Sequence, residues 1–270
     1  MISFPNAKIN LGLDIVERRK DGFHNLSSCF YPVRLQDILE INISDRFKIE
    51  LSGLPLPGDK NDNLVVRAYK LLKKDFDLPN IAIHLHKNIP AEAGLGGGSS
   101  DATFTLQMLN ERFDLFLNET VLEEYAGMLG SDCPFFIYNK PMIVGGRGED
   151  MNEINLDLKG YHIYLVKPPI SIFTKEAYKN IQPQKPSRDI SSILSDDRPA
   201  SWAGHLKNDF EKVIFHKHPE LSEIKSQLYK QGAVYASMTG SGSVIYGIFD
   251  DVPALRNSFP NQYFTWVGVL

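Results

Sequence analysis

The sequence contains few cysteines and no long run of apolar residues. Its 270 residues include only two cysteines, Cys29 and Cys133, which excludes a disulfide framework and the paired-cysteine spacing of a zinc site. No uncharged apolar segment approaches the roughly 18 residues that span a bilayer. The N-terminal stretch "MISFPNAKINLGLDIV" also lacks the basic and apolar regions of a secretory signal. We therefore expect a cytoplasmic protein that does not associate with membranes.

An excess of positive charge is missing as well. The 33 acidic residues outnumber the 29 lysines and arginines, which gives a net charge of −4 and argues against general affinity for nucleic acid. Hydrophobic residues make up 43% of the chain, enough to build the core of one large or two modest domains. We expect a monomer or a weak homodimer with no nucleic-acid partner.

Strand-like and helical patterns alternate along the chain, and no internal repeat is visible. Alternating apolar and polar residues predict strands over residues 8–16, 37–43, 47–51, 81–88 and 161–168. Helical spacing predicts helices over residues 63–76, 100–112, 118–128, 190–194 and 219–231. The first of these helices has Asn63 as a suitable N-cap, and the last is bounded by Pro219 and Gly232.

Turn signals connect these elements into an α+β arrangement. Asp21-Gly22 predicts a turn after the first strand, and residues 47–51 are expected to pair with 37–43. The apolar run 131–138 resembles a strand, and residues 233–250 are typical of two strands joined by a glycine turn. We expect antiparallel sheets and helices in two lobes, with domains at residues 1–150 and 151–270.

A glycine-rich loop separates the strand at 81–88 from the next helix. It has four glycines in five positions, Gly94, Gly96, Gly97 and Gly98. The loop lacks the lysine of a P-loop, and its spacing does not match G-x-G-x-x-G. Small residues before a helix N-terminus favour a polyphosphate ligand, and Ser99 and Ser100 could offer hydroxyls to phosphate or Mg²⁺. A flexible turn with no ligand is the alternative.

Three ordered motifs resemble those of the GHMP kinases. They are "PNAKINLGL" from Pro5, "PAEAGLGGGSSDA" from Pro90 and "MTGSGSVIYGIF" from Met238. The resemblance implies an N-terminal lobe like ribosomal protein S5, a C-terminal α+β lobe, ATP as co-substrate and Mg²⁺. It also implies phosphate contacts from Pro90, Gly94, Leu95, Gly96, Gly97, Gly98, Ser99 and Ser100.

Two further segments, "RKDGFHNL" and "LGSDCPFF", are similar to those of the family member that acts on a CDP-linked methylerythritol. That member transfers the γ-phosphoryl group of ATP to the 2-hydroxyl of the methylerythritol unit, in non-mevalonate isoprenoid biosynthesis. This chain departs from that member at four positions. Phe23 stands where tyrosine is more usual, and Asp101 where asparagine or alanine is. Ser131 stands where alanine is more usual, and Cys133 where valine is. We expect Asp101 in the first helical turn, where a carboxylate suits the helix dipole but competes with phosphate.

Lys8 and Asp132 are the catalytic residues that the resemblance implies. Asp132 is the expected base, and Lys8 would keep it ionised and attract the γ-phosphate. From the residues alone, Asp132 is equally typical of a turn or a helix cap, and Lys8 of an ordinary edge strand.

The resemblance also implies an acceptor site that binds a cytosine ring by stacking and hydrogen bonds. His24 is expected at the base edge, with Phe23 and Tyr178 on its faces. The remaining predicted contacts are Asn10, Thr239, Gly240 and Ser241. A surface turn, core aromatics and a plain hairpin are the alternatives for these positions.

Two other functions stay open at the level of sequence. A homoserine or mevalonate kinase of the same family would have no base to stack on Phe23. A ligand-binding relative without transfer activity would not need Lys8 and Asp132 together. His84 and His86 share one face of a strand, which allows metal ligation but is more typical of an exposed face.

Overall fold

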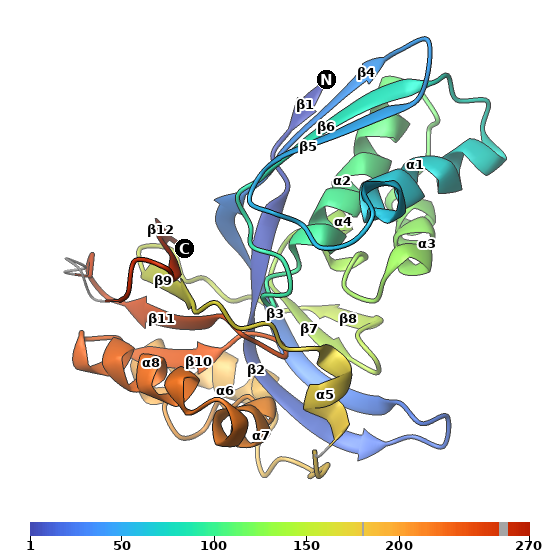
Figure 1. The fold of residues 1–270 in the computed structure, drawn as a ribbon. Helices are drawn as coiled ribbons and strands as arrows, with labels where there is room; N and C mark the ends of the chain where they lie inside the picture. The colour runs from blue at the N-terminus through green and yellow to red at the C-terminus, as the bar shows by residue number, and fades with distance from the viewer. Residues whose placement is uncertain (180, 254–258) are drawn as a thin grey trace. The chain divides into compact units, whose positions relative to one another are not determined.

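The computed structural model describes residues 1–179, 181–253 and 259–270 (Figure 1). Its strands are β1 (Ile2–Ser3), β2 (Asn6–Arg18), β3 (His24–Gln36), β4 (Ile38–Ile43), β5 (Lys48–Gly53), β6 (Ile81–Lys87), β7 (Met142–Gly145), β8 (Asp150–Glu153), β9 (His162–Lys167), β10 (Tyr235–Met238), β11 (Ile245–Phe249) and β12 (Phe264–Val269). Its helices are η1 (Lys60–Asp62), α1 (Leu64–Asp75), α2 (Gly97–Arg112), α3 (Glu119–Leu129), α4 (Phe135–Tyr138), α5 (Thr174–Lys179), α6 (Ile190–Asp196), η2 (Pro199–Ser201), α7 (Phe210–Lys217) and α8 (Pro219–Lys230). This mixture confirms the predicted α+β class.

The chain forms two compact units that interleave in sequence. The first contains residues 1–8, 35–91 and 96–140, and the second contains residues 9–34, 92–95 and 141–270. These compact units therefore differ from a division at residue 150, because residues 9–34 and the start of the glycine loop belong with the C-terminal part of the chain. Each unit has its own core.

The first unit packs helices α1, α2 and α3 beside one four-stranded sheet (Figure 1). The strand order is β1-β4-β6-β5. The prediction that residues 47–51 pair with 37–43 was wrong, because β6 lies between them and pairs antiparallel with β4 and parallel with β5. Every second residue of β6 is buried, from Ile81 to Lys87, so this strand occupies the apolar centre of the sheet.

In the first unit, one helix has its predicted N-cap, one begins earlier than predicted, and one forms where a strand was predicted. The predicted N-cap holds, since the Asn63 side chain accepts a hydrogen bond from the Val65 N–H at 3.0 Å. Helix α2 begins at Gly97, three residues before the predicted start. The run at 131–138 is not a strand: it is a turn followed by the short helix α4, which ends where Asn139 adopts a left-handed conformation. Pro134 immediately before this helix suits a helix start.

The second unit contains two four-stranded sheets, β2-β3-β7-β8 and β10-β11-β9-β12. The predicted turn at Asp21-Gly22 joins β2 to β3, with Gly22 at a φ of 85°. The predicted pair of strands around the glycine turn is β10 and β11, which pair antiparallel. Helices α7 and α8 pack on each other, and α8 packs on β10 and β11. Pro219 begins α8, and Gly232 follows its end with a φ of 96°.

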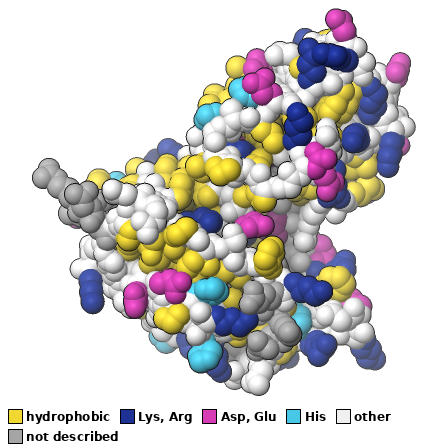
Figure 2. Space-filling view, viewed as in Figure 1, with side chains coloured by type: hydrophobic (Ala, Val, Ile, Leu, Met, Phe, Trp, Pro, Cys, Tyr) yellow, Lys and Arg dark blue, Asp and Glu magenta, His cyan; other side chains and the backbone are white. Residues whose placement is uncertain are grey.

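The surface and the thiols agree with the composition. On the face drawn in Figure 2, lysines and arginines are interspersed with aspartates and glutamates. Cys29 and Cys133 are both buried and form no disulfide. Within the described ranges, no helix is both long and apolar enough to cross a membrane.

Candidate active site

The glycine loop leads directly into the N-terminus of α2. Gly96 has a left-handed φ of 70° at the N-cap position, and no side chain caps the helix there. The first N–H groups of a helix have no partner within the helix, and they lie at the positive end of its dipole. Leu95 is buried. This end of α2 has the chemistry of an anion site.

Two of the loop glycines lie against other residues of the first unit. A Cβ atom on Gly96 would lie 3.0 Å from both Lys8 Cγ and Phe136 Cζ, and one on Gly97 would lie 2.8 Å from Ile89 Cγ2. Real Cβ atoms essentially never approach another atom below 3.0 Å. A side chain at Gly97 would force its surroundings to shift, and one at Gly96 would be tightly packed, so the loop is not simply a flexible connection.

The serines after the loop are the residues whose side chains could be ligands of a metal ion. Ser100 is fully buried, and its hydroxyl has no hydrogen-bond partner among the described residues. Hydroxyl oxygens are hard ligands that suit Mg²⁺. Over the same residues, no group of three or more His, Cys, Asp or Glu side chains could hold a metal ion. The donors present fit Mg²⁺ that arrives bound to the phosphates of a nucleotide.

Lys8 and Asp132 form an ion pair in the first unit. Lys8 Nζ lies 3.3 Å from Asp132 Oδ2, and the side chains are 3% and 36% exposed. Lys8 comes from β2, and Asp132 lies in the turn between α3 and α4. The two predicted catalytic residues are thus in contact, and Asp132 is the member of the pair that solvent reaches.

The turn that carries Asp132 is fastened to α2. Thr103 donates a hydrogen bond from its hydroxyl to the backbone oxygen of Cys133 at 2.8 Å. Burial raises the pKa of the Cys133 thiol to about 11, so this thiol stays neutral near pH 7. Cys133 thus acts as a packed residue that keeps its neighbour Asp132 in place.

A second cluster of charges, which we call the buried cluster, consists of Lys87, Asp37 and Asp101. Lys87 Nζ lies 2.6 Å from Asp101 Oδ2 and also contacts Asp37 Oδ2, and all three side chains are at most 2% exposed. Burial raises the pKa of Asp101 to about 8, more than the neighbouring Lys87 lowers it. Asp101 lies outside the first turn of α2 and is paired with Lys87, which corrects the expectation that it competes with phosphate.

Lys87 and Asp37 are not among the residues predicted from the sequence, although a signal for Lys87 was present. Lys87 falls at the same parity as Ile81, Ile83 and Leu85, which places it on the buried face of β6. A buried lysine requires a carboxylate partner.

In the second unit, Thr239 connects Asn10 with the start of the glycine loop. The Thr239 hydroxyl accepts the Asn10 N–H at 3.1 Å and lies 3.0 Å from the Gly94 carbonyl oxygen and 3.2 Å from Asn10 Oδ1. A Cβ atom on Gly94 would lie 2.1 Å from the Thr239 oxygen, and one on Gly240 would lie 3.1 Å from Gly94 Cα. The third motif therefore folds against the loop, as expected.

The other predicted residues of the third motif, Gly240 and Ser241, lie in the turn that follows Thr239. Gly240 has a φ of 54°, a conformation in which glycine carries no steric cost. Ser241 is half-buried and continues the same turn.

The predicted aromatic residues are brought together in part. The rings of His24 and Tyr178 stack with centroids 5.1 Å apart, and Tyr178 meets Phe210 edge-on at 4.8 Å. Burial and the nearby Arg18 lower the pKa of His24, which favours the neutral imidazole. Phe23 lies apart from this stack and is 57% exposed.

Phe23 has a cationic partner that the sequence analysis did not name. The guanidinium carbon of Arg147 lies 5.2 Å from the centroid of the Phe23 ring, within the range of a cation–π contact. The "GGRGED" turn that carries Arg147 gave no sign of this, because only the fold brings β7–β8 beside the first hairpin.

His84 and His86 are half-buried and form hydrogen bonds with a serine. Ser52 Oγ lies 2.8 Å from His84 Nε2 and 2.9 Å from His86 Nδ1. In the described part of the chain neither histidine belongs to a group that could hold a metal.

Comparison with known proteins decides the family. The model of the GHMP kinases N terminal domain matches residues 63–140, and that of the GHMP kinases C terminal matches residues 197–264. This chain belongs to the GHMP kinases. As a GHMP kinase it is 50% identical over 254 residues to 4-diphosphocytidyl-2-C-methyl-D-erythritol kinase of Bacteroides fragilis strain YCH46, covering 92% of both chains. It is 42% identical to the kinase of the same name from Parabacteroides distasonis, covering 100% of both.

Solved structures of GHMP kinases show the same fold. A crystal structure of 4-(cytidine 5'-diphospho)-2C-methyl-D-erythritol kinase matches with a TM-score of 0.76 and 29% identity, covering 92% of this chain and 90% of that one. Homoserine kinase from Cytophaga hutchinsonii matches with a TM-score of 0.65 and 13% identity, covering 98% and 95%. The predicted two-lobed GHMP-kinase fold is confirmed.

Proposed function

We propose that this chain is an ATP-dependent kinase that transfers the γ-phosphoryl group to the 2-hydroxyl of 4-diphosphocytidyl-2-C-methyl-D-erythritol, in non-mevalonate isoprenoid biosynthesis. The observation that carries the proposal is the set of relatives of that name, which align over nearly the whole chain. The contact between Lys8 and Asp132 supports the assignment to catalysis, because this pair joins a buried cation to an exposed carboxylate.

Lys8 and Asp132 are the proposed catalytic residues. In the transfer, the acceptor oxygen forms a bond to the γ-phosphorus while the bond from that phosphorus to the β–γ bridging oxygen breaks and ADP leaves. The proton of the acceptor hydroxyl passes to Asp132. Lys8 holds its ammonium group beside Asp132 and stabilises negative charge at the transferred group. Because the transition state of phosphoryl transfer is loose, orientation of the hydroxyl by Asp132 contributes as well.

The glycine loop and the serines after it are the proposed nucleotide-phosphate site. The uncapped N–H groups of α2 bind phosphate oxygens, and the close packing at Gly96 and Gly97 keeps the backbone of the loop in place. Ser99 and Ser100 are the proposed ligands of Mg²⁺, which neutralises phosphate charge when it is bound. Their hydroxyls are the hard donors that this ion prefers.

The proposed acceptor site uses the aromatic and polar residues of the second unit. Tyr178 offers a ring face, against which the His24 ring stacks. The neutral His24 imidazole has one donor and one acceptor, which match the polar edge of cytosine, and Phe23 stacks on the base. Asn10, Thr239, Gly240 and Ser241 bind the methylerythritol end. We further propose a cytoplasmic monomer or weak homodimer, with family domains dividing near residue 150.

A different acceptor within the same family is the main alternative. The structures of homoserine and mevalonate kinases match at 13% and 15% identity and share the fold only. The stack of His24 on Tyr178 favours the cytidine-linked acceptor, since neither homoserine nor mevalonate carries a ring to stack. The Lys8–Asp132 contact argues against a ligand-binding relative without transfer.

An acceptor panel tests the proposal. ADP release is measured with ATP, Mg²⁺ and one acceptor at a time: 4-diphosphocytidyl-2-C-methyl-D-erythritol, mevalonate, homoserine or galactose. We expect turnover with the cytidylyl compound alone. Turnover with another acceptor would keep the kinase chemistry and discard the cytosine site. Silence with every acceptor, while ATP still binds, would support the non-catalytic alternative.

A further inference from the structure

Asn208 holds the backbone on both sides of Thr239. Its side-chain Nδ2 donates hydrogen bonds to the Met238 and Gly240 carbonyl oxygens, both at 2.8 Å. Its Oδ1 accepts the Phe210 N–H at 3.0 Å. Asn208 is 3% exposed. Both N–H groups of this carboxamide are thus directed at the two carbonyls that flank a single residue of the third motif.

The segment that carries Asn208 is itself fixed to β2. The Leu13 N–H donates to the Lys207 oxygen at 2.8 Å, and the Asp209 N–H donates to the Leu13 oxygen at 2.8 Å. Asp209 Oδ2 also accepts the Ile15 N–H at 2.8 Å. The same strand carries Asn10, three residues before Leu13, so the segment and the proposed acceptor residue share one rigid support.

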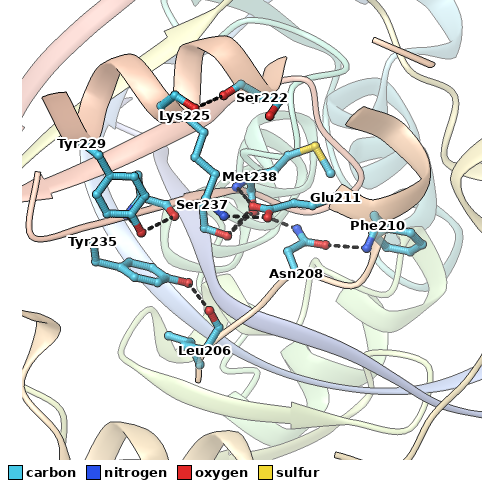
Figure 3. Close-up of polar contacts among 12 residues, drawn as sticks. Leu206, Asn208, Phe210, Glu211, Ser222, Lys225, Tyr229, Tyr235, Ser237 and Met238 are labelled. Atoms are coloured by element: carbon cyan, nitrogen blue, oxygen red, sulfur yellow. Dashed lines mark hydrogen bonds and ion pairs between the residues drawn. The ribbon is translucent and has the colours of Figure 1, made fainter. Parts of the chain in front are cut away.

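Glu211 holds the residues just before Thr239. Its Oε1 accepts the Met238 N–H at 2.8 Å and the Ser237 hydroxyl at 2.9 Å, and its Oε2 lies 2.6 Å from Lys225 Nζ (Figure 3). The Lys225 ammonium thus forms an ion pair with this carboxylate and helps to hold it beside Ser237 and Met238. Asn208 and Glu211 together fix residues 237–240 from outside the motif.

The fixed backbone of residues 237–240 determines which groups the Thr239 hydroxyl contacts. Ser28 donates its proton to the Gly12 oxygen at 2.6 Å, so at Asn10 it can only accept the side-chain N–H, at 2.9 Å. Asn10 Oδ1 then faces the Thr239 hydroxyl at 3.2 Å. A displaced Thr239 would release this carboxamide from its orientation.

We propose that Asn208 is a positioning residue for phosphoryl transfer, which acts by holding Thr239 against Asn10. This inference rests on the proposed function, because it takes Asn10 and Thr239 as residues that place the acceptor. Asn208 does not itself touch substrate. Alignment of the acceptor depends on Asn208, whereas binding of the nucleotide does not.

The test is a double-mutant cycle of Asn208→Asp and Thr239→Val. Asn208→Asp keeps the shape and the bond from Phe210 but turns a carboxylate oxygen toward two carbonyls. We expect kcat to fall about 10- to 100-fold, the range for a small misplacement of reacting groups, while the Kd for ATP measured by calorimetry is unchanged. Because both residues act through one contact, the double variant should be little worse than the poorer single variant. Losses that multiply would overturn the proposal.

Asn110→Asp is the matched control. Asn110 also bridges a loop, donating to the Leu117 oxygen at 3.0 Å and accepting its N–H at 2.9 Å, but it lies in the last turn of α2, at the opposite end of the helix from the proposed phosphate site. It should lower the melting temperature and leave kcat unchanged when assays run well below that temperature. An equal loss of kcat in this variant would reduce Asn208 to a general structural role.

A measurement independent of activity separates this inference from the proposed function. Hydrogen exchange followed by mass spectrometry should show faster exchange in Asn208→Asp for a peptide covering residues 237–244, with other peptides unchanged. Unchanged exchange there would overturn the positioning role even if no acceptor in the panel is phosphorylated. Wild-type inactivity on every acceptor, with faster exchange in the variant, would instead overturn the proposed function alone.

Discussion

The two lysine–aspartate clusters of the first unit differ in what they leave open to a ligand. Both lysines are buried, with Lys8 3% and Lys87 2% exposed. Lys87 is enclosed by Asp37 and Asp101, which are 0% and 2% exposed, whereas Lys8 faces Asp132, which is 36% exposed. Exposure of the carboxylate, rather than the ion pair itself, separates a cluster that supports the fold from one that can receive a substrate proton.

The balance of charge differs in the same way. The buried cluster sets two carboxylates against one ammonium, and a surplus charge in an apolar interior is costly. Burial raises the pKa of Asp101 to about 8. The cluster therefore keeps a proton, which reduces the cost of its surplus negative charge. The Lys8–Asp132 pair has one side chain of each sign, and its carboxylate is partly open to water.

The largest effect should come from Asp132→Asn. The variant keeps the size of the side chain but can no longer accept the proton of the acceptor hydroxyl. We expect kcat to fall about 10²-fold or more, the usual scale for a positioned acid–base group, with ATP binding retained. Initial rates at saturating substrates and calorimetry of ATP binding provide the measurement.

Asp59→Asn is the control for this variant. Asp59 caps η1 by accepting the Asn61 N–H, and asparagine caps equally well, so turnover should be unchanged. Near-normal kcat in Asp132→Asn would show that the exposed pair is structural, and the contrast between the two clusters would then fail.

Asp101→Asn should change stability and its dependence on pH, with a smaller effect. Asp101 holds a proton up to a pH of about 8 in the folded chain, but only up to its ordinary value of 3.8 when unfolded. Between these values the unfolded state binds fewer protons, so the free energy of unfolding of the wild type falls as pH rises. The variant does not titrate there, and we expect it to gain about 2 kcal/mol relative to wild type from pH 5 to pH 7.

Urea unfolding at pH 5, 6 and 7 measures this difference, with Asp59→Asn as an exposed reference. A difference that stays constant with pH would mean that Asp101 is ionised throughout and that Lys87 outweighs burial. A fall in kcat as large as that of Asp132→Asn would show that the buried cluster takes part in the reaction.

The sequence predicted the residues of local motifs better than their long-range partners. The glycine loop, the Asn63 cap and the contact of Lys8 with Asp132 followed from composition or from a resemblance to known motifs. The place of β6 between β4 and β5 could not be read locally, because strand order depends on which apolar strand reaches the centre of the sheet. Asp101 was misplaced for a similar reason, since its partner Lys87 is fourteen residues away.

The smallest effect concerns the link between the buried cluster and the loop, and Gly97→Val tests it. A Cβ atom at Gly97 would lie 2.8 Å from Ile89 Cγ2 and 3.4 Å from Lys87 Nζ. If the buried cluster holds Ile89 and Lys87 in place, the glycine loop must move away from them. The KM for ATP should then rise about tenfold, or ~1.4 kcal/mol, with kcat less affected. Gly127→Ala on α3, where a Cβ atom would meet its nearest neighbour at 3.9 Å, should change neither. An unchanged KM in Gly97→Val would mean that Ile89 and Lys87 yield, and that the cluster supports the sheet without supporting the loop.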